Sequence, residues 1–394
     1  MGVPGIIAGM ERLPVFALEQ YFAQWEFKAR HHLTASDAQT VTIGELLDLA
    51  GGDSRQEFLA LPLGYVPTWG TDALRAAVAA TYERAAAQDV LLFAGAEEAL
   101  FWTLQELLGP QDHAVVTVPN YQAMESVPLA TGAAVTGVPL WHGDGPGWRL
   151  DVDRVRDAMT ARTTVVAVNF PNNPTGHVPD QRTWAELAAL CDERGVYLFA
   201  DEVYRGVEAD PQATLPAAVD LAERGISLDV TSKSLGLPGL RVGWLACRDR
   251  ELLARLESRK HWTSICNAGP SELLALHAVR NADVLRGRVH ALIAANLPVF
   301  DAFFAEHADL FEWQAPDGGC VAFPRYLGSD GVDTFCADLV EERGVLLLPG
   351  SVYASKLLDV PQDRFRIGVG RRDPEPALAE LGAFLAGRRS VTRG

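Results

Sequence analysis

The sequence predicts an α/β fold: a large domain with a mostly parallel sheet flanked by helices, and a smaller α+β domain. From about residue 72 onward, short apolar runs alternate with longer segments whose apolar residues recur at helical spacing. This alternation is typical of βαβ units and therefore of a parallel sheet. After about residue 283 it gives way to one long helical segment, two strand-like runs and a final helical segment. A chain of 394 residues usually forms more than one domain.

The strands of the large domain are predicted from apolar runs at 113–118, 163–170, 196–200 and 226–230. Helices are predicted from helical spacing over 73–86, 97–108 and 180–194. The third helix is expected to end at Gly195, since glycine commonly follows the last helical residue.

The small domain is predicted from a long helix over about 283–305, strand-like runs at 320–324 and 345–348, and a helix from Pro374. The stretch up to about residue 50 is helical in part and too short to form its own core, so we expect it to pack on this domain. We therefore predict a large domain over 45–285 and a small domain formed by 1–44 and 286–394.

The charge balance argues against nucleic-acid binding. The chain carries 51 acidic and 34 basic residues, a formal net charge of −17, and such a surface repels polyanions. No apolar run approaches the roughly 20 residues that a membrane helix needs, so no membrane partner is expected. A single small anion can still be bound by a few arginines and backbone amides.

The expected location is the cytoplasm. Residues 1–15 lack the basic region and cleavage site of an export signal. The five cysteines are scattered without a C-x-x-C pair, which favours reduced, structural thiols. No metal site is predicted, because His31, His32 and His261 lack the spacing of metal ligands.

Lysine is rare in this chain. Only four are present, Lys28, Lys233, Lys260 and Lys356, so any covalent chemistry that uses an amine has few candidates. Lys28 lies in an N-terminal helical stretch, Lys260 is expected on a charged helix face, and Lys356 is expected in a loop. Lys233 alone lies within a recognisable motif.

Polar motifs follow the predicted strands, where the ligands of doubly wound sheets bind. They are F-A-G-A-E-E at 93–98, N-F-P-N-N-P-T-G at 169–176, D-E-V-Y-R-G at 201–206, and T-S-K-S at 231–234 running on to G-L-R-V-G-W at 239–244. Each motif alone has an ordinary structural explanation, such as a turn, a helix cap or a surface charge. Their order is more specific, with spacings of 28, 32 and 8 residues from Asn173 through Asp201 and Lys233 to Arg241.

In this order and spacing, the motifs resemble the fold type I pyridoxal-phosphate enzymes of the class I/II aminotransferase family, from about residue 63 to 371. The resemblance implies pyridoxal 5'-phosphate as cofactor and Lys233 as its Schiff-base lysine and the catalytic base. Asp201 would keep the ring nitrogen protonated. Asn173 and Tyr204 would bind the phenolic oxygen of the ring.

The resemblance also implies a site for the cofactor's phosphate. Arg241 matches the family's phosphate arginine. Ala96 and Glu97 lie at the start of a predicted helix, and their backbone N–H groups would donate to the phosphate. The Glu97 side chain is expected to point away. Many relatives carry Ser or Thr where this chain has Val230, so Ser232, or Ser234, is expected to compensate.

Three further residues have family counterparts. Tyr121 would stack on the ring, and Arg366 would bind the substrate α-carboxylate with both guanidinium nitrogens. Tyr65 resembles the tyrosine that reaches the phosphate of the neighbouring subunit, which implies a homodimer with a shared active site.

The chain departs from the family near its N-terminus, where the common G-x-P loop is absent. The segments T-A-S-D at 34–37 and T-I-G-E-L-L at 42–47 take its place. They loosely resemble a subgroup that includes capreomycidine synthase, which cyclises an arginine derivative. In addition, Met124 stands where some relatives have a polar residue behind Asp201.

These observations favour an aminotransferase (EC 2.6.1.-) of amino acid metabolism that moves the amino group of an L-amino acid to a 2-oxo acid. A pyridoxal-phosphate lyase or cyclase acting on a specialised amino acid, such as an arginine derivative, stays open because all these reactions share the first carbanion. A regulator with this fold would need an added DNA-binding domain, and the segment before residue 63 contains no helix-turn-helix pattern.

Overall fold

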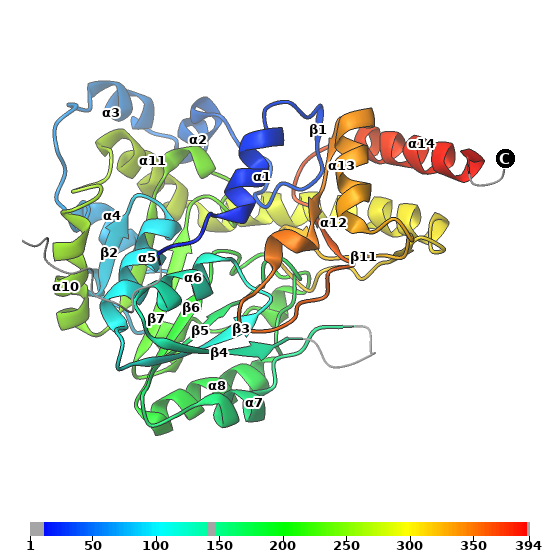
Figure 1. Ribbon diagram of the computed structural model, residues 1–394. Helices are drawn as coiled ribbons and strands as arrows, with labels where there is room; N and C mark the ends of the chain where they lie inside the picture. Colours follow the sequence, from blue (N-terminus) through cyan, green and yellow to red (C-terminus); the bar gives the residue numbers. More distant parts are fainter. Residues whose placement is uncertain (1–11, 141–146, 392–394) are drawn as a thin grey trace, which may run out of the picture.

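A seven-stranded sheet forms the centre of the protein in the computed structural model, which describes residues 12–140 and 147–391 (Figure 1). Its strand order is β2-β8-β7-β6-β5-β3-β4. The strands are β2 (Val90–Phe93), β3 (His113–Val118), β4 (Ala134–Pro139), β5 (Thr163–Asn169), β6 (Tyr197–Asp201), β7 (Gly225–Val230) and β8 (Gly243–Cys247). All neighbours are parallel except β8, which is antiparallel to both β2 and β7.

The α/β prediction is confirmed, and β3, β5, β6 and β7 lie within one residue of their predicted bounds. The strands β2, β4 and β8 were not predicted. Four apolar residues make β2 too short to distinguish from a helix segment. The residues of β4 are mostly half-buried and include Thr136 and Gly137, so they form no apolar run.

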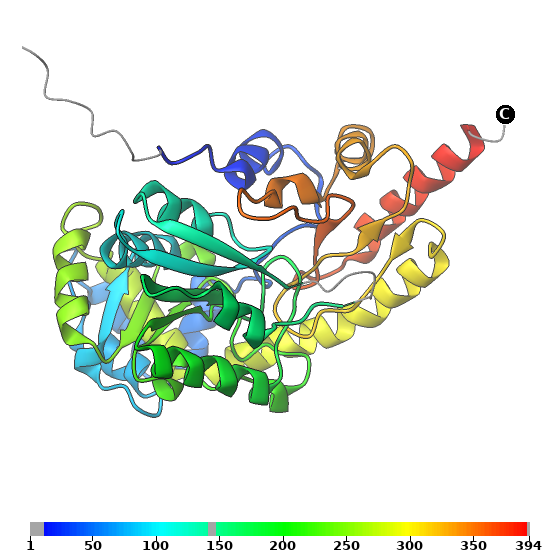
Figure 2. The ribbon, with the colours of Figure 1, turned by 60° about the horizontal axis from the view of Figure 1, so that its bottom comes forward.

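Helices cover both faces of this sheet, as Figures 1 and 2 show. They are α2 (Ile43–Ala50), α3 (Ser54–Ala60), α4 (Asp72–Ala79), α5 (Ala96–Leu107), α6 (Ala123–Ala130), α7 (Val152–Ala158), α8 (Gln181–Arg194), α9 (Ala218–Leu221), α10 (Arg250–Lys260) and α11 (Gly269–Arg280). Successive residues of β6 point to opposite cores: Phe199 packs with residues of α5 and α6, and Leu198 with residues of α8. This alternation follows from the two-residue period of a strand.

The helix predicted over 73–86 ends early, at Ala79. The backbone N–H groups of Glu83 and Arg84 donate to the Asp220 carboxylate at 3.0 and 2.8 Å instead of continuing the helix. This long-range contact is invisible to local spacing. By contrast, α8 follows its prediction closely: Asp180 caps it and Gly195 closes it in the left-handed region, with φ 63°.

The remaining elements lie at the end of the sheet where β6 and β7 finish (Figure 2). They are α1 (Ala17–Trp25), β1 (His31–His32), α12 (Ala282–Glu306), β9 (Phe311–Glu312), β10 (Val321–Ala322), β11 (Arg325–Tyr326), α13 (Val332–Arg343), β12 (Val345–Leu346), β13 (Leu348–Pro349), β14 (Phe365–Gly368) and α14 (Glu375–Val391). Short 3-10 turns lie at Ala87–Asp89, Pro211–Ala213, Pro238–Leu240 and Gly350–Tyr353. The long helix, the strand-like runs and the last helix of the prediction are all present, although the strands are only two residues long.

Two segments far apart in sequence meet here, because β1 pairs in parallel with β12. Buried side chains of α12, α13, α14 and β14 form one core, which also contains Leu33, Ala38 and Tyr204. The N-terminal stretch is thereby held against the C-terminal part of the chain. The domain boundaries at 45–285 stay a prediction.

Among the described helices, α12 is the one with a length and apolar composition that would suffice to cross a membrane. Its residues Val289, Ile293, Phe300 and Phe304 belong to the core described above, as in a core helix of a globular domain. The five cysteines form no disulfide, and four of them are buried. The expectation about an export signal rests partly on residues 1–11, which lie outside the described residues.

Candidate active site

A cavity of about 800 Å³ opens where the sheet strands end and the N-terminal segment passes β14. Asn169, Asp201 and Val230, the last residues of β5, β6 and β7, line it. The strand ends therefore converge as predicted. From the other side, residues 33–37 and Arg366 of β14 complete the wall.

Lys233 lies inside this cavity, three residues after the end of β7. Its Nζ donates a hydrogen bond to Oγ of Ser36 at 2.8 Å. Burial lowers the pKa of the Lys233 ammonium, and the nearby Arg366 charge lowers it further, while Asp37 opposes the shift. The amine is thus held closer to its neutral, basic form than a solvated lysine.

Asp201 is buried at the end of β6, where its Oδ1 accepts a hydrogen bond from the Val203 N–H at 3.2 Å. Burial raises its pKa to about 7, and the charge of Asp229 adds to the rise. Lys233 acts in the opposite direction. A cationic partner beside this carboxyl would restore its charged form.

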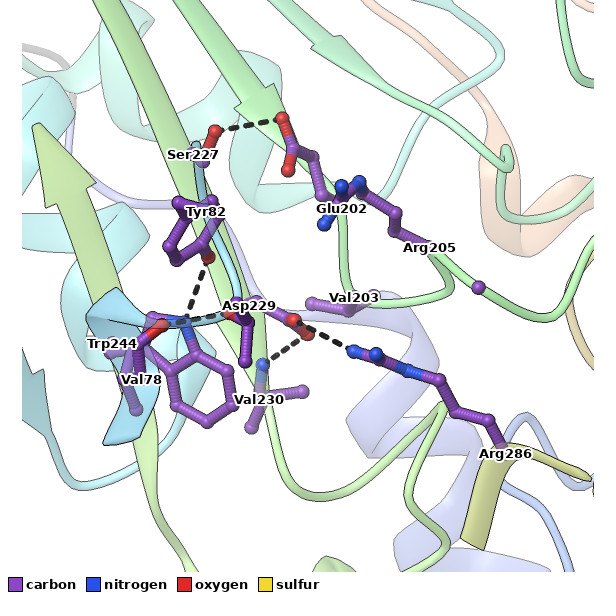
Figure 3. Close-up of polar contacts among 12 residues, drawn as sticks. Val78, Tyr82, Glu202, Val203, Arg205, Ser227, Asp229, Val230, Trp244 and Arg286 are labelled. Atoms are coloured by element: carbon purple, nitrogen blue, oxygen red, sulfur yellow. Dashed lines mark hydrogen bonds and ion pairs between the residues drawn. The ribbon is translucent and has the colours of Figure 1, made fainter. Parts of the chain in front are cut away.

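Buried polar side chains gather just after the end of β6 and along β7 (Figure 3). Glu202 accepts from Ser227 at 2.8 Å through one oxygen, and its other oxygen has no hydrogen-bond partner. Asp229 accepts from the Val230 N–H at 2.7 Å and lies 3.8 Å from the Arg286 guanidinium. Burial raises the pKa of Glu202 to about 7 and that of Asp229 to about 6.

Arg366 is 1% exposed and meets the cavity from β14. Its guanidinium donates to Tyr353 Oη at 2.8 Å, to Asn173 Oδ1 at 3.3 Å and to the Thr34 carbonyl oxygen at 2.9 Å. All three acceptors are neutral, and Arg366 has no ion pair within the described part of the chain. A buried guanidinium without a carboxylate is suited to an anionic ligand.

Asn173 and Tyr204 complete the same wall. Asn173 Oδ1 also accepts from Tyr353 Oη at 2.9 Å, and its backbone N–H donates to Asn169 Oδ1 at 2.7 Å. The Tyr204 hydroxyl donates to the carbonyl oxygen of Ser36 at 2.6 Å. The predicted residues Asn173, Tyr204 and Arg366 are therefore brought together with Lys233.

The far end of the cavity gathers Arg241, Ala96 and Ser232. Gly95 precedes α5 with φ 100°, and a Cβ atom there would lie 2.6 Å from Nη2 of Arg241. Ser232 Oγ is buried without a hydrogen-bond partner, and so is Oγ of Ser234. Val230, where many relatives carry Ser or Thr, is buried and has no hydroxyl to offer the phosphate.

Tyr121 and Glu97 face each other across the same end. The Tyr121 ring lines the cavity and lies against Phe16, with ring centroids 5.2 Å apart. Glu97 also lines the cavity, and burial raises its pKa to about 7. The expectation that the Glu97 side chain points away from the phosphate stays a prediction.

Tyr65 and Lys260 do not line this cavity. Tyr65 does not reach the cavity of its own chain and is 93% exposed. The expectation that Lys260 lies on a charged helix face is wrong: Lys260 is buried, and its Nζ donates to the Thr68 carbonyl oxygen at 2.6 Å and to Asn267 at 3.0 Å. Lys260 lies on the same buried face of α10 as Leu252, Leu253 and Leu256, although its sequence neighbours are charged.

Sequence reasoning missed two residues of the site. Tyr353 bonds both Asn173 and Arg366 from a 3-10 turn, and nothing in the local sequence signals this. Ser36 contacts Lys233 and lies in the T-A-S-D segment that departs from the family pattern. That departure was the signal that could have identified Ser36.

The model of the aminotransferase class I and II family matches residues 62–377. The chain therefore belongs to this family, its fold is that of the fold type I pyridoxal-phosphate enzymes, and pyridoxal phosphate is its cofactor.

Particular relatives resemble it over almost its full length. The chain is 32% identical to a capreomycidine synthase of Streptomyces vinaceus over 98% of both chains. A pyridoxal-phosphate-dependent aminotransferase from Streptococcus suis 89-1591 superimposes with a TM-score of 0.88 at 26% identity, covering 95% of this chain and 98% of that one. The pyridoxal-phosphate-dependent cyclase OrfR superimposes with a TM-score of 0.86 at 28% identity, covering 97% and 100%.

The residues present fit this cofactor. A phosphate needs positive charge and donors. The cavity offers the Arg241 guanidinium, which the missing side chain of Gly95 allows to lie close to the start of α5, and the unpartnered hydroxyl of Ser232. Arg241 forms no ion pair with any described residue. Lys233 and Asp201 line the same cavity. The Lys233 amine would attach the cofactor covalently, and the buried Asp201 carboxyl would pair with the nitrogen of its pyridine ring.

Proposed function

We propose that the protein is an aminotransferase that moves the amino group of an L-amino acid to a 2-oxo acid. The observation that carries this proposal is the cavity shared by the Lys233 amine, the Asp201 carboxyl and the unpaired Arg366 guanidinium. An amine of lowered pKa supplies a base, and the guanidinium supplies a site for the α-carboxylate.

Lys233 is both the attachment point of the cofactor and the base that takes the proton from the substrate Cα. Bound pyridoxal phosphate supplies an electron sink for the pair left by that proton. Arg366 binds the substrate carboxylate and so fixes Cα near Lys233. In this proposal Asn173 has a hydrogen-bonding role toward both substrate and cofactor.

The other residues hold the cofactor. Asp201 pairs with the ring nitrogen, and the positive charge there lowers the otherwise raised pKa of the carboxyl. Tyr204 and Asn173 bind the phenolic oxygen, and Tyr121 packs on the ring. Arg241, Ser232 and the backbone N–H groups of Ala96 and Glu97 hold the phosphate.

A second candidate is a lyase or cyclase that acts on a specialised amino acid such as an arginine derivative. One structural observation favours it: the Thr34–Asp37 segment, which replaces the family's usual loop, contacts Lys233 and Arg366 directly. The full-length relative named capreomycidine synthase supports the same candidate. The first step, loss of the α-proton to Lys233, is common to both reactions.

We also propose a homodimer in which Tyr65 completes the partner's site. Two neighbouring segments carry exposed large apolar side chains: Leu59, Leu63 and Tyr65 on one, and Trp262 and Ile265 on the other. The two segments are tied together, because Lys260 at the end of α10 donates to the Thr68 carbonyl oxygen. Large exposed apolar side chains grouped in this way are typical of an interaction surface. The cytoplasm is the location that we propose for this dimer.

A panel of L-amino acids tests the proposed function. We expect at least one to convert the bound cofactor to its amino form, with the matching 2-oxo acid as product. Identification of the products by mass spectrometry separates the candidates. A cyclised or unsaturated product without amino transfer would select the second candidate, and no reaction of any amino acid would contradict both.

A further inference from the structure

Ser36 lies outside the part of the chain that matches the family model, yet its hydroxyl contacts the amine at the centre of the cavity. Lys233 Nζ donates to Ser36 Oγ at 2.8 Å, and residues 62–377 make up the family match. No other side-chain hydrogen bond of Lys233 is found among the described residues. The hydroxyl is therefore the polar partner that fixes where the amine points.

The backbone around Ser36 is held firmly on both sides. The Gly368 N–H of β14 donates to the Leu33 carbonyl oxygen at 2.9 Å, and Arg366 donates to that of Thr34 at 2.9 Å. Asp37 accepts two hydrogen bonds of 2.8 Å from the Arg371 guanidinium. A hydroxyl carried by so constrained a segment loses little entropy when it binds the amine.

The side chain and the backbone of Ser36 contact different partners. The Tyr204 hydroxyl donates to the carbonyl oxygen of Ser36 at 2.6 Å, while Oγ meets Lys233. A substitution that removes only the hydroxyl therefore keeps the Tyr204 contact. In addition, the segment packs directly against the backbone of β14, since a Cβ atom at Gly368 would lie 2.2 Å from the Ala35 carbonyl oxygen.

We propose that Ser36 is a further catalytic residue: its hydroxyl orients the Lys233 amine toward the substrate and accepts a hydrogen bond from the ammonium that forms when Lys233 takes the α-proton. In that step the Cα–H bond breaks, an N–H bond forms on Lys233, and the electron pair stays with the substrate. This inference rests on the proposed role of Lys233 as the base.

The hydroxyl acts within a defined electrostatic setting. Burial is the main influence and opposes the protonated form of Lys233, as does Arg366, whereas Asp37, Cys320 and Asp201 favour it. A hydrogen bond to a charged donor is stronger than one between neutral groups. Loss of Oγ therefore disfavours the ammonium and lowers the pKa of Lys233.

The test compares Ser36→Ala with Ser36→Thr, which keeps a hydroxyl, and with Ser258→Ala. The Ser258 hydroxyl donates a hydrogen bond to the Ala254 carbonyl oxygen on the exposed side of α10, away from the cavity. Its removal therefore serves as the matched control. The first readout uses cofactor-free protein with isotope-labelled lysine. With four lysines in the chain, the signal that Lys233→Ala removes identifies Lys233 in an NMR titration.

We expect Ser36→Ala to lower the Lys233 pKa by about one unit, the equivalent of a tenfold change in equilibrium. The second readout is exchange of the substrate α-hydrogen with deuterium from the solvent, which depends on the proton transfer and not on the final product. We expect its kcat to fall about 10-fold or more with KM within about twofold. Ser36→Thr should recover much of both losses, and Ser258→Ala should match the parent.

An unchanged Lys233 pKa in Ser36→Ala would overturn the proposal, and so would a loss of exchange without a pKa change, since that indicates a structural role. If the parent exchanges no α-hydrogen, the proposed function fails. The titration still decides whether Ser36 supports the Lys233 ammonium.

Discussion

Lys233 is the side chain on which the proposed chemistry depends. It is one of four lysines, and burial also lowers the pKa of Lys260, to about 8. Lys260 does not line the cavity and is held by Thr68 and Asn267. The geometry thus separates two amines that composition alone left equivalent.

Replacement of Lys233 by Ala is expected to remove the visible absorbance of the covalently bound cofactor and to reduce turnover at least a thousandfold, since attachment point and base are lost together. Absorbance spectra and turnover measurements check this result. Lys28→Ala, a substitution outside the cavity, is the matched control. If the absorbance persisted in Lys233→Ala, another lysine would be the attachment point.

Asp201→Asn is expected to leave the cofactor bound and to lower turnover about a hundredfold or more. The amide keeps the shape but cannot hold a proton on the ring nitrogen by charge pairing. Cofactor content and kcat measured on the same sample check both parts. Near-normal kcat would contradict the role proposed for Asp201.

Glu202, directly behind Asp201, provides a test of the buried electrostatics. Burial raises its pKa to about 7, above its value in the unfolded chain. Its protonated form therefore stabilises the fold fully below about pH 4.5, and this contribution, on the order of 3 kcal/mol, is lost as pH rises through 7.

Glu202→Gln removes this pH dependence. In cofactor-free protein we compare the melting temperature of the variant with that of the parent at each pH. We expect this difference to be a few degrees higher at pH 8 than at pH 5. Thermal unfolding at both pH values measures the difference. Glu251→Gln, at an exposed position of α10, should show the same offset at both, and an equal offset for Glu202→Gln would show that the carboxyl is ionised throughout.

At the scale of single elements, the entry to α5 positions the phosphate end of the cavity. Gly95 adopts φ 100°, and a side chain there would meet the Arg241 guanidinium. Gly95→Ala should therefore strain the backbone and displace Arg241, which weakens cofactor affinity about tenfold or more.

Titration of cofactor into cofactor-free protein measures this loss of affinity. Gly239→Ala, two residues before Arg241 and with open space around a new Cβ atom, should bind the cofactor like the parent. Equal affinity of both variants would argue against phosphate binding at this end of the cavity.

The central elements could be predicted because each has a strong local signal. The bounds of β3, β5, β6 and β7 follow from their apolar runs, and those of α8 follow from its capping residues. The strands β2, β4 and β8 could not be predicted. β2 is short, β4 is half-buried, and β8 is antiparallel to both of its neighbours, so none of them belongs to a clear local pattern. The early end of α4 depends on Asp220, far away in the sequence.

The candidate site divides in the same way. The family resemblance predicted Asn173, Asp201, Tyr204, Lys233, Arg241 and Arg366, and all six line one cavity. Ser36 and Tyr353 enter it from segments whose position depends on the packing of β14 and of the Gly350–Tyr353 turn. Such long-range placement is set by tertiary structure and not by local sequence.

At the scale of the whole molecule, the net charge of −17 and the positive cavity residues are compatible. Repulsion of polyanions comes from the overall charge, whereas one phosphate or carboxylate needs only the local charge of Arg241 or Arg366. The exposed apolar side chains around Leu63 and Tyr65 are not buried by any residue in the described part of their own chain, and the proposed dimer would cover them.

Disruption of this surface tests the proposed dimer. Leu63→Glu places charge where an 87% exposed leucine now lies, and we expect it to shift sedimentation from dimer to monomer and to weaken cofactor binding, because Tyr65 would no longer reach the partner's site. Val284→Glu, at an exposed apolar position on α12, is the control. A parent protein that sediments as a monomer would contradict the shared site.

The most direct test of the central claim is to follow the amino nitrogen itself. The cofactor-loaded protein is supplied with a ¹⁵N-labelled L-amino acid that reacts in the donor panel and with an unlabelled 2-oxo acid, and the products are analysed by mass spectrometry. Amino transfer predicts that ¹⁵N appears in the amino acid formed from the 2-oxo acid, and that Lys233→Ala abolishes it. Retention of ¹⁵N in a product of the donor, or its release as ammonia, would contradict the claim.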